Sequence, residues 1–189
     1  QYEYPWSFSF VNQRYSLERI TDAALLYGRG SAQDPDLLAA LQATWNVTGE
    51  IELLPHTQGI DEAAFKNCIE PFTLTHMGDL VWIMDNAFEN SGISGTLTLP
   101  ESLEYIGIQA FADCRNLEAV WFPGAALTQI ESSAFAGCTS LASVEFAQNS
   151  VMDMISEAAF ANTALKTIEL PASLTALGTE VFFECRQLK

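Results

Sequence analysis

The sequence predicts an α/β solenoid, a right-handed coil of stacked repeats with a curved parallel sheet and short helical turns, preceded by an N-terminal helical cap. Two observations favour this fold class. A segment of alternating apolar and polar residues occurs once in each repeat. Phenylalanines also recur every 22 to 25 residues, at Phe65, Phe88, Phe111, Phe135, Phe160 and Phe182. A fixed period in this range is typical of solenoid proteins.

Residues 1–49 lack this period, and they predict the cap. Apolar residues recur at helical spacing after Ser16, which predicts a first helix. A second helix is expected to begin at Asp34, a capping residue, with Pro35 at the first helical position. An aromatic-faced strand is expected from Tyr2, Tyr4, Trp6, Phe8 and Phe10. A solenoid needs its first repeat covered, so we expect a cap here, with a separate binding module as the alternative.

Residues 50–189 predict about six repeats. In segments such as 97–99, 120–122, 144–146 and 168–170, two apolar residues flank a middle residue that points the other way, as in a strand. Proline then ends several of these strands, because it has no donor for ladder pairing. The Ala-Phe segment is expected to form a short helical turn that places the ring in the centre. One repeat cannot bury its apolar edge alone, whereas stacked repeats share a core.

The pattern from Leu103 to Pro123, with Ala110, Phe111 and Cys114 in its middle, resembles the BspA-like class of bacterial leucine-rich repeats. The resemblance covers about residues 50–189. It implies a right-handed leucine-rich-repeat coil in an exported bacterial protein, often on the cell surface, that binds host or microbial proteins. It implies no catalytic residues. The repeat between Phe65 and Phe88 departs from the pattern, so its strand near residues 73–75 is expected to be the least regular.

The charge balance excludes several partners. The chain holds 24 acidic and 8 basic residues, a net charge of -16. A protein that binds nucleic-acid phosphates or anionic lipid needs clustered lysine and arginine. We therefore expect no nucleic-acid partner and no docking on anionic lipid. No apolar run approaches the ~20 residues of a membrane helix, which argues against membrane insertion. Because the chain begins at Gln1, we expect a removed signal segment and an extracellular or cell-surface location.

No catalytic, cofactor or metal residue is predicted. The chain has no CxxC, no nucleophile triad and no glycine-rich phosphate loop, and His56 and His76 are 20 residues apart. Cys114 and Cys138 lie in adjacent repeats, but inward, parallel side chains suit a disulfide poorly. We therefore predict a module without enzymatic activity and with buried free thiols. Cys185, in the last repeat, is expected to be the most accessible of the four cysteines.

The outward side of the strands is the predicted protein-binding face. Its residues are Thr75, Thr98, Trp121, Glu145 and Glu169. Trp121 stands out because exposed aromatic side chains are enriched at binding hot spots, although an incidental, covered aromatic is the alternative. Trp82 and Tyr105 form a second candidate patch on another face. The sequence thus favours adhesion or recognition of an unidentified protein.

Two alternatives remain open at this point. The chain could instead be a structural spacer of a longer surface protein, with no ligand of its own. The last repeat, which carries no evident C-terminal cap, also leaves self-association open.

Overall fold

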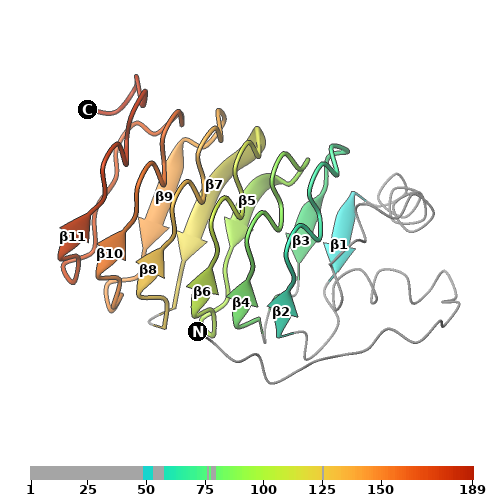
Figure 1. Ribbon diagram of the computed structural model, residues 1–189, viewed down its shortest axis with the longest axis horizontal. Coiled ribbons are helices and arrows are strands. Elements are labelled where there is room, and N and C mark those ends of the chain that lie inside the picture. Colours follow the sequence, from blue (N-terminus) through green and yellow to red (C-terminus); the bar gives the residue numbers. More distant parts are fainter. Residues whose placement is uncertain (1–48, 53–57, 76, 78–79, 125) are drawn as a thin grey trace, which may run out of the picture.

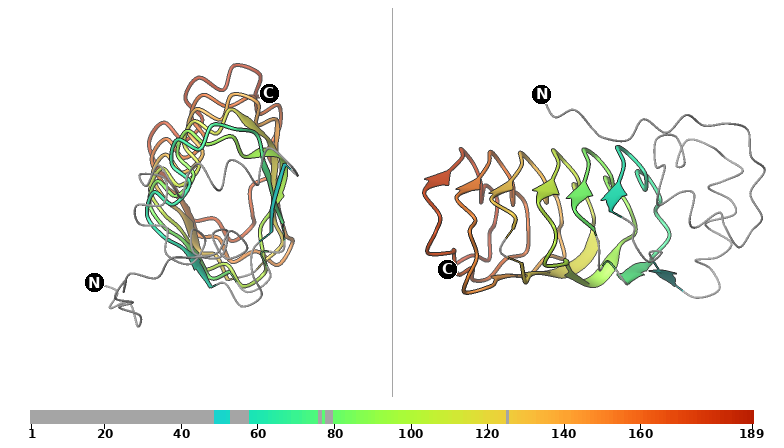
Figure 2. Two further views of the ribbon diagram at one scale, coloured as in Figure 1. Left: turned by 90° about the vertical axis from the view of Figure 1, so that its right-hand side faces the viewer. Right: turned by 90° about the horizontal axis from the view of Figure 1, so that it is seen from below.

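Two rows of parallel strands run along opposite sides of a flattened coil (Figures 1 and 2). The computed structural model describes residues 49–52, 58–75, 77, 80–124 and 126–189. The first row consists of β1 (Glu50–Glu52), β3 (Thr73–Thr75), β5 (Ser94–Thr98), β7 (Asn116–Phe122) and β9 (Ser143–Phe146). The second row consists of β2 (Gly59–Ile60), β4 (Trp82–Ile83), β6 (Tyr105–Ile106), β8 (Gln129–Ile130), β10 (Met154–Ile155) and β11 (Ala176–Leu177).

Strand pairing follows the repeat period. The first row is hydrogen-bonded as β1–β3 and β5–β7–β9, and the second as β2–β4–β6 and β8–β10–β11. Buried apolar residues pair across neighbouring strands, for example Val120 with Val144. In the first row the ladder is interrupted between β3 and β5, where a single bridge joins Phe72 to Ile93. This interruption lies in the repeat that the sequence predicts to be least regular.

The expectation of short helical turns is wrong, because the described residues contain no helix. The segments around the phenylalanines are turns instead. Each has left-handed residues two positions before and two after the ring, such as Gln109 at φ 55° and Asp113 at φ 56°. A left-handed L-residue interrupts an α-helix. The described part is therefore a parallel β-solenoid rather than an α/β coil.

Backbone hydrogen bonds explain this turn conformation. The N–H groups of Gln109, Phe111 and Asp113 donate to carbonyls of the next coil at 2.7–3.1 Å. The intervening N–H groups of Ala110 and Ala112 close tight turns within their own coil. A helix would direct all of these donors along one segment. Here every second donor joins two coils, so the turns act as a third ladder.

The six phenylalanines form one continuous stack. Neighbouring ring centroids are 4.9, 5.0, 5.1, 5.5 and 6.1 Å apart along the chain, with planes within 9° of parallel. These separations exceed the ~3.5–4.0 Å contact distance of carbon atoms, so the rings are offset rather than eclipsed, as aromatic pairs prefer. The first five rings are fully buried. The predicted phenylalanine spine is confirmed.

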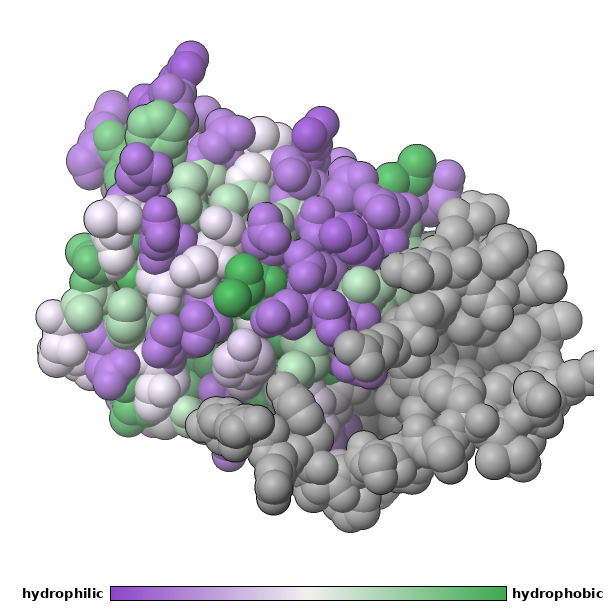
Figure 3. Space-filling model, viewed as in Figure 1, coloured by the Kyte–Doolittle hydropathy of each residue, from purple (hydrophilic) through white to green (hydrophobic). Residues whose placement is uncertain are grey.

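Most of the exposed large apolar side chains among the described residues lie in the C-terminal third, although Ile69, at 63%, is the most exposed one. Leu177 is 49% exposed, whereas Ile155, its partner in the preceding coil, is fully buried. Phe183 is 56% exposed. Hydrophilic side chains cover most of the middle of the face in Figure 3, and apolar ones become more frequent toward this end.

The predicted N-terminal cap lies outside the described residues except for Gly49. His56 and His76 lie outside them as well. Their predicted roles therefore stay expectations.

Candidate functional site on the outward face of the first strand row

Three of the five predicted face residues lie side by side. Thr98 pairs with Trp121 across β5 and β7, and Trp121 pairs with Glu145 across β7 and β9. Alternation along the strands buries Val120 and Val144 and turns these three side chains outward. Thr98 and Glu145 are exposed, and Trp121 is half-buried. The strand alternation expected from the sequence holds for these three residues, and their role in binding stays a prediction.

The other two face residues are placed differently. Thr75 lies on β3, which pairs with β1 and not with β5. Glu169 lies in residues 168–170, which the sequence predicts to be a strand but which form none. No backbone hydrogen bond joins this segment to β9. Leu170 is 39% exposed, so no buried side chain at that position fixes the register of the segment.

A groove opens where residues 167–169 separate from β9. It has a volume of about 310 Å³ and is lined by Trp121, by residues 143–146 and by residues 167–169. Phe146 and Ile168 are half-buried along it, and Glu145 and Glu169 are exposed. No sequence pattern predicts this groove, because it arises where an expected strand does not pair with β9.

The two carboxylates of the groove carry no counter-charge among the described residues. The ion pairs there are Lys66 with Glu89, Arg115 with Asp113 and Arg186 with Glu184, all away from the groove lining. The Ser143 hydroxyl donates a long hydrogen bond to Glu145 Oε1 at 3.5 Å. The groove is therefore electronegative and bordered by an indole ring.

The second candidate patch lies on the opposite row of strands. Trp82 and Tyr105 pair in register across β4 and β6, and both are half-buried. A β-carbon added to Gly59 would lie 1.8 Å from Trp82 Nε1, so the indole covers that glycine. The Tyr105 hydroxyl donates to Asp85 Oδ1 at 3.4 Å. Both rings thus contact neighbouring residues of the solenoid itself.

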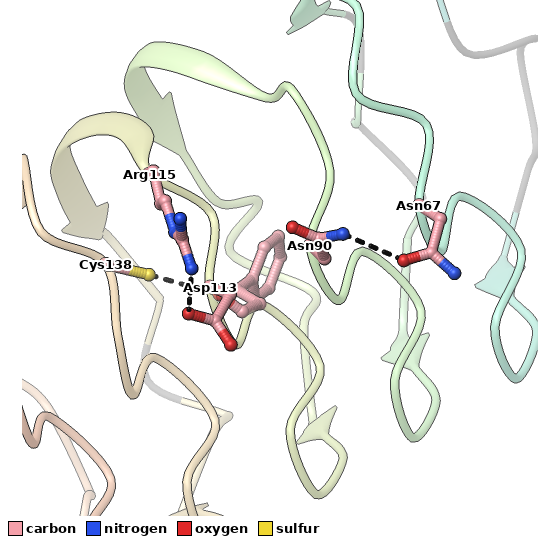
Figure 4. Close-up of polar contacts among 6 residues, drawn as sticks. Asn67, Asn90, Asp113, Arg115 and Cys138 are labelled. Carbon is pink, nitrogen blue, oxygen red and sulfur yellow. Dashed lines mark hydrogen bonds and ion pairs between the residues drawn. The ribbon is translucent and has the colours of Figure 1, made fainter.

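The cysteines occupy a structural position, three residues after each ring. The thiols of Cys114, Cys138 and Cys185 donate to phenylalanine carbonyls of the preceding coil at 3.0–3.1 Å (Figure 4 shows Cys138). All four cysteines are free, and Cys185 is the half-buried one, as predicted. Burial raises the pKa of Cys68 to about 12. Because the thiolate is the reactive form, the Cys68 thiol suits packing rather than nucleophilic chemistry.

A column of left-handed residues two positions after each ring, five of them polar, was missed by the sequence interpretation. Asn90 Nδ2 donates to Asn67 Oδ1 at 2.9 Å, and Asp113 of the next coil contacts Arg115 at 3.4 Å (Figure 4). The members are Asn67, Asn90, Asp113, Gly137, Asn162 and Glu184, all left-handed. Asparagine, aspartate and glycine tolerate this conformation best, so their recurrence at one column was the available signal.

Within the described residues, no three His, Cys, Asp or Glu side chains gather closely enough to hold a metal ion. The same part of the chain contains no helix with the length and apolarity to span a membrane.

Comparison with known proteins identifies relatives of the solenoid. Residues 43–149, more than half of the chain, match the family model described as the BspA type leucine rich repeat region, in six copies. A leucine-rich cell surface protein of Faecalibacterium prausnitzii is similar over 74% of this chain, with 28% identity and a TM-score of 0.59. A leucine-rich repeat protein of T. pallidum is similar over 72% of the chain, with 26% identity and a TM-score of 0.56.

The pneumococcal vaccine antigen PcpA shares the fold over 70% of the chain, at 22% identity and a TM-score of 0.54. The chain spans 37% of the length of the F. prausnitzii and pneumococcal structures and 64% of the T. pallidum one. No curated protein sequence matched the chain.

Proposed function

Because the chain belongs to the BspA-type leucine-rich repeat family, we propose that it is a cell-surface recognition module that binds a protein through the outward face of β5, β7 and β9. The F. prausnitzii relative is described as a cell surface protein, which supports the proposed location. Repeat solenoids present extended surfaces on which partners are recognised. Catalysis forms no part of this proposal.

The single observation that carries the proposal is the register of Thr98, Trp121 and Glu145. The inward residues of the same strands are buried and account for the fold. The outward residues form no part of that core. A half-buried tryptophan in the middle strand gives this face a rigid aromatic group of the kind enriched at binding hot spots. With a net charge of -16, the chain favours a neutral or basic partner over an acidic one.

Site-specific photo-crosslinking tests the proposal. A photoreactive phenylalanine analogue is placed at Thr98, beside the indole, and in a second protein at Glu157, which is exposed on the opposite side after β10. Both proteins are irradiated with a panel of extracellular and mucosal proteins. We expect an adduct from position 98 that an excess of unmodified chain suppresses, and no matching adduct from position 157.

The alternative function is a spacer that holds other parts of a longer surface protein apart. The continuous stack of six rings favours it, because such a core makes a stiff rod. Equal adducts from positions 98 and 157, or none from either across the panel, would contradict the recognition proposal and favour the spacer.

A further inference from the structure

The groove between β9 and residues 167–169 combines three features that suit a cationic ligand. It is open to solvent, it is bordered by the Trp121 ring, and it holds two carboxylates without a cationic partner in the described part of the chain. Its volume of about 310 Å³ lies at the lower end of the range for ligand pockets. That size suits one side chain better than a whole cofactor.

The spacing of these groups matches a planar cation. Trp121 and Glu145 are register partners on adjacent strands, so their β-carbons lie about 5 Å apart. Glu169 is one coil further on, at the other wall of the groove. A cation held over an indole within ~6 Å of its centre is attracted by the ring, and a carboxylate beside it adds a charge-assisted hydrogen bond.

Arginine fits this arrangement better than lysine. Its guanidinium group is planar, stacks on aromatic faces and offers a fork of donors to a carboxylate. Glu145 Oε1 accepts only the long bond from Ser143, and Glu169 accepts none from the described residues. Two carboxylates on one side of a guanidinium, with an indole under its plane, would satisfy its charge and its face together.

We propose that the Trp121–Glu145–Glu169 groove binds an arginine side chain of an extended segment of the partner protein. This inference rests on the proposed recognition function and names the chemistry of its central contact. The acidic chain adds long-range attraction for such a segment, since net charge -16 favours encounter with a basic partner. The half-buried Phe146 and Ile168 would contact the aliphatic stem of the arginine.

A titration with defined peptides tests the proposal without knowledge of the partner. The probe is an acetylated Gly-Ser-Arg-Ser-Gly amide, and its matched control carries citrulline, the neutral isostere of arginine. Binding is followed by the indole N–H resonance of Trp121 in the ¹⁵N-labelled chain, assigned by its loss in Trp121→Phe. We expect the arginine peptide to shift this resonance and the citrulline peptide to bind at least about 5-fold more weakly.

Charge-neutralising variants locate the cation. Glu145→Gln and Glu169→Gln should each weaken the arginine peptide roughly 3–10-fold, whereas Glu157→Gln on the opposite side should leave it unchanged. All three positions are exposed, so the variants keep the core intact. Trp121→Leu keeps an apolar side chain but removes the ring and with it the reporter resonance, so its binding is measured by isothermal titration calorimetry beside the parent and should be about 2–5-fold weaker.

Three results would overturn the proposal: equal binding of the arginine and citrulline peptides, equal binding of a matched lysine peptide, or no effect of either groove glutamine. The crosslinking experiment at position 98 tests the proposed function independently of these results. If position 98 forms an adduct but the arginine and citrulline peptides bind equally, the recognition face is retained and the arginine groove is rejected.

Discussion

The Cys138 thiol donates a hydrogen bond to the carbonyl oxygen of Phe111 at 3.1 Å. The same oxygen accepts the backbone N–H of Cys114 at 3.3 Å, so it receives one donor from its own coil and one from the next. The thiols of Cys114 and Cys185 donate to the preceding coil in the same way. Small side chains with a donor also occupy this column at Ser91 and Thr163, and the Thr163 hydroxyl donates to the Phe160 carbonyl of its own coil at 3.0 Å.

The ring stack yields the first prediction. Phe111→Ala removes a fully buried ring that lies between two others, and it should lower the free energy of unfolding by about 3–5 kcal/mol. Urea denaturation followed by circular dichroism measures this loss. Phe183→Ala is the matched control, because Phe183 is 56% exposed and its truncation should cost within about 0.5 kcal/mol. A loss below about 1 kcal/mol for Phe111→Ala would contradict the central role of the stack.

Thiol accessibility gives the second prediction. Cys68, Cys114 and Cys138 are fully buried, and Cys185 is half-buried. A thiol reagent added to the native chain should therefore modify Cys185 first, and all four cysteines should react in denaturant. Mass spectrometry of the modified peptides identifies the order. Rapid native modification of Cys114 or Cys138 would show that the coils open there on the timescale of the reaction.

The pH dependence of stability gives the third prediction. Burial raises the pKa of Cys68 to about 12, whereas an unfolded thiol ionises near pH 8.5. Between these values the unfolded chain has lost a proton that the native chain retains, so stability is complete below about pH 8.5 and falls as pH rises toward 12. The free energy of unfolding of Cys68→Ser should fall less steeply between these pH values. Serine is a suitable replacement because Ser91 occupies the equivalent position in the next coil. Parallel curves for the two proteins would contradict the assignment.

Much of the solenoid is predictable because its period is strict. Most coils repeat one buried ring and one buried strand residue, such as Phe111 and Val120, so the register of the paired strands follows from the sequence alone. The conformation of the ring segment was harder to predict. Apolar residues there recur at i and i+4, as they do in a helix. Every second backbone N–H nevertheless donates to the next coil, and whether it does so depends on tertiary contacts.

The candidate site was only partly predictable for a related reason. Strand alternation places Thr98, Trp121 and Glu145 on one face. The groove depends on residues 167–170 not pairing with β9, although their alternation equals that of the strands that do pair. The pattern fixes which side chains point outward, but the depth of packing behind Leu170 decides whether the strand forms.

Two neighbouring glycines give the fourth prediction. A β-carbon at Gly92 would lie 2.1 Å from the backbone oxygen of Glu70 in the preceding coil, and no side-chain movement relieves that contact. Gly95 has φ +72° but open space around it. Gly95→Ala should lower the free energy of unfolding by about 1–2 kcal/mol, because alanine is strained in the left-handed conformation. Gly92→Ala should lower it by about 1–3 kcal/mol, because the added methyl group overpacks the contact with Glu70.

Crystal structures distinguish these two causes. We expect the coils to move apart near Glu70 in Gly92→Ala and to remain in place in Gly95→Ala. An unchanged spacing in Gly92→Ala would contradict the close approach of the two coils at this point.

The last prediction separates folding from recognition at Trp121. Its side chain points outward from β7 and is half-buried, while Val120 and Phe122 on either side fill the core. Trp121→Ala should therefore leave the unfolding midpoint within a few degrees of the parent, since surface substitutions away from the core change stability little. It should weaken binding of the crosslinked partner by about 30-fold or more, because truncating a hot-spot aromatic costs at least ~2 kcal/mol of binding. Trp82→Ala on the opposite row is the matched control and should bind the partner as the parent does. If Trp82→Ala is the variant that loses binding, the recognition surface lies on β4 and β6 instead.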